Sequence, residues 1–140
     1  MKEKPLVLIV DDQPDNLYMY ARYLDGQGEY RVITAMNGTE ALLKARRFRP
    51  NVILLDLAMP TMSGYDVARA LAADEATRAI PIVLVSAYAS QADAVAALGD
   101  SSFASFVGEV AAGYVSKPCL PEVLLQHVQK AVGRGGRRGL

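Results

Sequence analysis

The polar residues best suited to chemistry in this chain each come directly after a short apolar run. They are Asp11 and Asp12, Asp56, Ser86 and Lys117. Three carboxylates held close together repel one another, and a divalent cation removes that repulsion. Mg²⁺ prefers such oxygen ligands and keeps part of its water shell. The residue types therefore indicate an acidic site for Mg²⁺, or for Mn²⁺, beside a hydroxyl and an ammonium group.

A carboxylate in such a site can also act as a nucleophile toward phosphorus and form an acyl phosphate. Phosphoryl transfer requires the negative charge on the phosphoryl oxygens to be neutralised, which a metal, a lysine and a hydroxyl can do together. The residues thus indicate an aspartyl-phosphate site. Residue types alone leave open which of Asp11, Asp12 and Asp56 accepts the group.

The elements that carry these residues can be read from apolar patterns. Continuous aliphatic and β-branched runs predict buried strands at 6–10, 30–35, 52–55, 81–85 and 114–116. Helical spacing of apolar residues predicts helices that begin near Pro14, Asn37, Ser63, Ser90 and Pro121. This alternation predicts a doubly wound α/β fold, with helices on both faces of a parallel sheet. Ligand sites in such sheets lie at the carboxyl ends of the strands, where the polar residues fall.

The motifs at these strand ends resemble the CheY-like receiver domain of two-component response regulators. The matching segments are Asp11-Asp12, 56–60 with Gly64, Ser86-Ala87 and 114–118. The resemblance covers about residues 5–132. It implies a flavodoxin-like sheet with strand order 2-1-3-4-5, in a receiver of the single-domain type.

The resemblance also implies a role for each site residue. Asp56 is the expected phosphoacceptor. The expected ligands of Mg²⁺ are Asp12, Asp56 and the Ala58 carbonyl, with Asp11 acting through a water molecule. The groups expected to bind the phosphoryl oxygens are the side chains of Ser86 and Lys117 and the backbone N–H groups of Ala58 and Ala87. Ser86 and Tyr114 are the expected switch pair, and Lys117-Pro118 the expected cis peptide bond.

The function implied by this resemblance is a signalling switch rather than a turnover enzyme. A histidine kinase or a phosphotransfer protein would donate the phosphoryl group. Output would be contact with an unknown downstream protein through the face made by the fourth helix, fifth strand and fifth helix. Three other interpretations would each have a sequence signature of their own. Loss of a site residue would favour a phosphorylation-independent adaptor. An Asp-x-Asp motif after the first strand would favour a phosphatase. A Gly-rich phosphate-binding loop would favour a nucleotide-binding module.

Two departures from the family pattern carry expectations of their own. The spacing from Ser86 to Lys117 is longer than usual, and the surplus lies in 99–113. Helical spacing around Phe103 and Phe106 predicts an extra short helix over 102–112, which either packs on its own domain or forms a homodimer contact. Ala58 and Tyr88 flank the expected path of the hydrolytic water, which predicts slow self-dephosphorylation.

Composition places limits on the class of protein. The chain has 140 residues, which suits one domain, and its hydrophobic fraction of 51% excludes a disordered chain. A net charge of +0 argues against direct DNA binding. Cys119 is a lone cysteine, expected as a small buried residue, and no signal peptide or membrane span is evident, so a cytoplasmic location is expected. His127 is expected to be structural, and 133–140 to form a flexible Gly/Arg tail after a domain at 1–132.

Overall fold

Five parallel strands form a single sheet at the centre of the molecule, in the order β2-β1-β3-β4-β5. The structure is a computed structural model, which describes residues 3–59, 62–87 and 111–138. The strands are β1 (Leu6–Val10), β2 (Arg31–Ala35), β3 (Val52–Asp56), β4 (Ile82–Ser86) and β5 (Ala111–Ser116). Every residue of β1, β3 and β4 is buried, as their uninterrupted aliphatic runs predict. The predicted parallel sheet and its strand order are confirmed.

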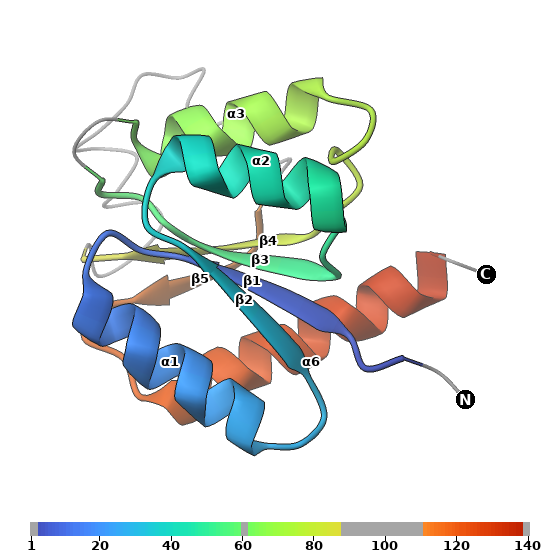
Figure 1. The fold of residues 1–140 in the computed structure, drawn as a ribbon. Coiled ribbons are helices and arrows are strands. Elements are labelled where there is room, and N and C mark those ends of the chain that lie inside the picture. Colours follow the sequence, from blue (N-terminus) through green and yellow to red (C-terminus); the bar gives the residue numbers. More distant parts are fainter. Residues whose placement is uncertain (1–2, 60–61, 88–110, 139–140) are drawn as a thin grey trace.

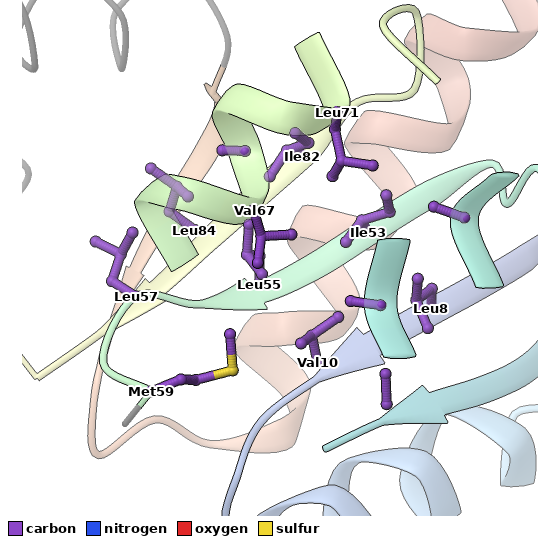
Figure 2. Packing of buried hydrophobic residues seen from close by; sticks show 14 residues of the cluster. Leu8, Val10, Ile53, Leu55, Leu57, Met59, Val67, Leu71, Ile82 and Leu84 are labelled. Carbon is purple, nitrogen blue, oxygen red and sulfur yellow. The ribbon is translucent and has the colours of Figure 1, made fainter. Parts of the chain in front are cut away.

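Helices cover both faces of this sheet (Figure 1). The described helices are α1 (Pro14–Gly26), α2 (Gly38–Phe48), α3 (Gly64–Ala73) and α6 (Pro121–Arg138). Helices α2 and α3 lie on one face, and α1 and α6 lie on the other (Figure 1). Each layer encloses an apolar cluster. Figure 2 shows the cluster under α2 and α3, where Val67 and Leu71 of α3 pack over Ile53 and Leu55 of β3.

The helix starts predicted near Pro14, Asn37, Ser63 and Pro121 are present, and those at Asn37 and Ser63 have side-chain capping contacts. Pro14 occupies the first turn of α1, where its missing N–H costs little. The Asn37 side chain accepts a hydrogen bond of 2.8 Å from the Glu40 backbone N–H. Ser63 and Asp66 form a reciprocal capping box at α3. Helix α1 ends at Gly26 with Gln27 as its cap, and the positive φ falls at Gly28.

Strand β5 begins at Ala111, three residues earlier than predicted. Ala111 pairs with Ile82, and the register shifts by one residue before Gly113 pairs with Val83. The predicted helix over 102–112 is therefore wrong at its last two residues, because hydrogen bonding to the buried β4 draws them into the sheet. Residues 99–110, including Phe103 and Phe106, lie outside the described residues, as does the helix predicted near Ser90.

Helix α6 continues through Arg138 and so enters the segment predicted to form a flexible tail. The bounds of a helix do not measure how much it moves, so the flexibility of 133–140 stays a prediction. Within α6, His127 is half-buried against β5, since a Cβ added at Gly113 would lie 2.8 Å from its Nδ1. Burial, and then the charge of Lys130, lower the pKa of His127. No helix in the described part of the chain is long and apolar enough to span a membrane.

Candidate functional site

The register of the sheet brings the polar strand ends to one edge. Val10 pairs with Leu55, so Asp11 and Asp56 are the next residues on neighbouring strands. Asp56 in turn pairs with Val85, which places Ser86 one step further along β4. Ser86 pairs with Ser116, so that Lys117 follows directly beyond it on the outer strand. Parallel pairing thus aligns residues that are more than a hundred positions apart in the sequence.

An acidic cluster forms at the centre of this edge. Asp11, Asp12 and Asp56 each offer a carboxylate oxygen, and these oxygens all lie within 4.8 Å of one another. Asp11 and Asp56 are buried, with 3% of each residue exposed. Asp12 is half-buried. A cluster that combines buried carboxylates with one reachable from solvent has the hard oxygen donors that Mg²⁺ or Mn²⁺ requires.

Lys117 lies against two of these carboxylates. Its Nζ donates hydrogen bonds of 3.1 Å to Oδ2 of Asp11 and 3.1 Å to Oδ2 of Asp56. Burial alone would lower the pKa of Lys117, but the charges of Asp56 and Asp11 outweigh it and raise the pKa. The ammonium group therefore stays charged between the carboxylates of β1 and β3.

Among the carboxyl groups of the described residues, Asp56 is the one that the fold destabilises most clearly in its ionised form. Burial is the largest effect and raises its pKa to about 6, with a further contribution from the charge of Asp11. The Ala58 N–H and the Lys117 ammonium act in the opposite direction without cancelling the shift. A buried carboxylate that lacks full charge compensation is a site where an added cation binds favourably.

Backbone and amide donors orient the two buried carboxylates. The Gln13 backbone N–H donates to Oδ1 of Asp11 at 2.9 Å, and the Ala58 backbone N–H donates to Oδ1 of Asp56 at 3.1 Å. Both donors stand two residues after the aspartate, the spacing of an Asx turn. Asn16 adds a side-chain contact of 3.4 Å to Asp11. Sequence reasoning missed Gln13 and Asn16, although the Asx spacing could have indicated the first.

The remaining predicted site residues also lie at this edge or beside it. Ser86 is buried at the end of β4, its carbonyl accepts from the Lys117 N–H, and Ala87 follows it. Tyr114 is half-buried on β5, opposite Leu84. The Lys117–Pro118 peptide bond is cis. Tyr88 lies outside the described residues.

Comparison with known proteins places these features in a family. The response regulator receiver domain matches residues 7–129, which is most of the chain. The chain belongs to the response regulator receiver family. This receiver is 32% identical to the protein PilH of Pseudomonas aeruginosa over 122 residues, covering 87% of the chain and 93% of PilH.

Two further relatives differ in how much of their own length the chain covers. The receiver is 41% identical over 99 residues to the response regulator PleD of Caulobacter vibrioides, covering 69% of the chain but only 22% of PleD. The crystal structure of the chemotaxis protein CheY4 of Vibrio cholerae superposes with a TM-score of 0.77 at 31% identity, covering 92% of the chain and 99% of that protein. The fold and its strand order are therefore those of a CheY-like receiver.

Membership of the family carries general properties. Receiver domains are signalling switches rather than turnover enzymes, and they bind Mg²⁺ at an acidic cluster. They interact with histidine kinases or phosphotransfer proteins and with downstream targets. The cluster of Asp11, Asp12 and Asp56 has the donor set that such a site needs.

Proposed function

We propose that this receiver accepts a phosphoryl group on Asp56 in a Mg²⁺-dependent reaction and signals through altered protein contacts. The observation that supports it best is the Lys117 ammonium, held 3.1 Å from Asp56 beside the acidic cluster. A histidine kinase or phosphotransfer protein would be the donor. Both the cation and the lysine would stand where negative charge builds up during transfer.

Asp56 is better placed as the acceptor than its neighbours. It lies at the end of the central strand β3, between β1 and β4. Asp11 is held by three donors, namely Gln13, Asn16 and Lys117, which leaves its oxygens less available for attack. Asp12 is half-buried and can reach a metal from the solvent side.

The metal would be held by Asp12, Asp56 and the Ala58 carbonyl, with Asp11 acting through water. When bound, Mg²⁺ would neutralise charge on the phosphoryl oxygens. A carboxylate oxygen of Asp56 attacks phosphorus and forms the new O–P bond, while the bond from phosphorus to the donor breaks. With acetyl phosphate as donor, acetate leaves with that bond's electron pair, and no proton transfer is needed. With phosphohistidine, the imidazole nitrogen leaves with that bond's electron pair and takes up a proton from the solvent.

The chain's own groups would then hold the product. Lys117 exchanges its contact with the Asp56 carboxylate for one with a phosphoryl oxygen. The Ser86 hydroxyl and the N–H groups of Ala58 and Ala87 supply further donors. Movement of Ser86 toward the phosphoryl group would leave space for Tyr114 to turn inward, which alters the surface around β5. A homodimer through 99–113 stays a prediction.

The test compares the protein with its Asp56→Asn variant. Each is incubated with Mg²⁺ and acetyl phosphate, and intact mass is measured. We expect one phosphoryl adduct on the protein and none on Asp56→Asn, with Asp66→Asn as a matched control that keeps the adduct, because Asp66 caps α3. No adduct on the unaltered protein, or an equal adduct on Asp56→Asn, would refute the proposal.

A further inference from the structure

Tyr20 places a hydroxyl inside an apolar cluster, and the proposed transfer step makes no use of it. The side chain comes from α1, is 5% exposed and belongs to the cluster between α1, α6 and the sheet. Its hydroxyl shares a hydrogen bond of 3.5 Å with Sγ of Cys119. Burial, and then this contact with Cys119, raise the pKa of Tyr20, so the hydroxyl stays protonated. A buried hydroxyl needs a partner, and this one finds it in the loop that carries Lys117.

That loop is the segment between β5 and α6. Pro118 in this loop and Pro121, which begins α6, both lack a backbone N–H donor. At its start, the Lys117 N–H donates to the Ser86 carbonyl at the end of β4. Two residues later, the Cys119 thiol is tied to Tyr20 on α1. Lys117 therefore lies between a backbone anchor on β4 and a side-chain anchor on α1.

The position of this loop decides where the lysine ammonium stands. Nζ of Lys117 is 3.1 Å from one carboxylate oxygen of Asp11 and 3.1 Å from one of Asp56. A displacement of about 1 Å would lengthen one contact beyond hydrogen-bond range. Lysine has a flexible four-carbon stem, so its rotamers alone do not hold the ammonium in place. Supporting contacts to the loop must supply the missing rigidity.

We propose that Tyr20 is a positioning residue for Lys117 and acts through the thiol of Cys119. The contact holds the loop so that the ammonium meets the phosphoryl oxygens as the bond between Asp56 and phosphorus forms. The inference rests on the transfer to Asp56 proposed above and adds the element that orients its lysine. Tyr20 acts indirectly, because its hydroxyl contacts Cys119 and not Lys117 itself.

The first test is Tyr20→Phe, which removes the hydroxyl and keeps the buried ring. We expect the rate of phosphorylation by acetyl phosphate at saturating Mg²⁺ to fall roughly tenfold, because a slightly misplaced charge slows transfer. Tyr30→Phe is the matched control, since Tyr30 is 6% exposed and belongs to the same cluster. Tyr30 directly precedes β2 and does not belong to the loop that carries Lys117. This control should leave the rate unchanged. All rates are measured well below each variant's melting temperature.

A second readout does not depend on phosphoryl transfer. The Lys117 ammonium and Mg²⁺ compete for the carboxylates of Asp11 and Asp56, so Lys117→Met should tighten Mg²⁺ binding measured by titration calorimetry. Tyr20→Phe should tighten it in the same direction by a smaller factor, because a loosely held ammonium competes less well. A change of stability alone would not produce tighter binding.

Conservative variants and a double-mutant cycle complete the test. Cys119→Ser, which keeps a hydrogen-bonding group, should retain most of the rate, and Cys119→Ala should reproduce Tyr20→Phe. In a Lys117→Met background, Tyr20→Phe should cause no further loss, because both changes act through one ammonium. Equal rates for the unaltered protein and Tyr20→Phe, or a loss that persists without Lys117, would overturn the inference and leave the proposed function standing. No adduct on the unaltered protein, or an equal adduct on Asp56→Asn, would overturn both.

Discussion

Lys117 and a metal ion would compete for the carboxylates of the acidic cluster, and this competition would set the chemistry of the site at the scale of single residues. The ammonium already contacts Asp11 and Asp56. Burial nevertheless holds the pKa of Asp56 at about 6, so one lysine does not fully compensate the ionised cluster. The remaining unfavourable charge is what a cation or a neutral side chain at position 56 would relieve.

Asp56→Asn should therefore stabilise the metal-free protein in a pH-dependent way. In the unaltered protein, the folded-state pKa of Asp56 is about 6, above the ordinary value of 3.8. The favourable contribution of the protonated Asp56 carboxyl group to folding is therefore fully present below pH 3.8 and is lost as the pH rises through about 6. The variant should exceed the unaltered protein by roughly 2–3 kcal/mol at pH 8, with the difference shrinking toward low pH. Chemical denaturation in chelator measures it. Asp25→Asn, at an exposed site on α1, should show no such trend, and a less stable Asp56→Asn at pH 8 would contradict the argument.

At the scale of elements, the N-terminus of α3 packs closely against the end of β3. The Gly64 N–H donates to the Leu57 carbonyl at 3.0 Å. A Cβ added at Gly64 would lie 2.7 Å from the Leu57 Cα and would also collide with the Asp56 carbonyl. Those atoms are backbone and cannot move aside without shifting the strand end that carries Asp56.

Gly64→Ala should consequently lower the free energy of unfolding by about 1–3 kcal/mol, as overpacking does elsewhere, and slow phosphorylation of Asp56. Gly26→Ala is the matched control, since nothing lies within 4 Å of a Cβ added there. That control should be neutral or slightly stabilising, by up to about 1 kcal/mol. Denaturant titration of both variants measures the two free energies of unfolding. Equal values would contradict the prediction, because they would show that the N-terminus of α3 shifts to accommodate the added Cβ at little cost.

At the scale of the whole molecule, the site joins four strands into one unit. One residue of the site lies at the carboxyl end of each of these strands: Asp11 at β1, Asp56 at β3, Ser86 at β4 and Lys117 at β5. The sheet aligns these residues, and the four described helices cover its two faces. The acidic cluster exists only when the strands are paired. A ligand of that cluster must therefore stabilise the fold as a whole.

Mg²⁺ should raise the melting temperature of the protein, and the rise should continue with the logarithm of the Mg²⁺ concentration above the dissociation constant. A concentration one hundred times the dissociation constant corresponds to about 2.7 kcal/mol of added stability. Asp12→Asn should lose most of the shift, while Asp15→Asn, an exposed residue in the first turn of α1, should retain it. Thermal unfolding at constant ionic strength provides the measurement. A shift that survives in Asp12→Asn would exclude Asp12 as a ligand.

Much of the fold could be predicted because it depends on local patterns. The aliphatic runs of β1, β3 and β4 can only be satisfied by burial on both faces, and the caps at Asn37 and Ser63 depend on residues three positions away. The boundary of β5 could not be predicted in this way. Ala111 lies in the sheet because it pairs with Ile82, a partner that the pattern around residue 111 does not specify.

The sequence by itself determined which residue types stand at the strand ends, because each follows an apolar run that must be buried. It therefore indicated the three carboxylates, the serine and the lysine as one set. Only the tertiary structure decided that Lys117 bridges Asp11 and Asp56, and that Tyr20 reaches Cys119 across the core. These contacts join residues from 61 to 106 positions apart. Strand register and helix packing set such distances, and no local pattern in the chain records them.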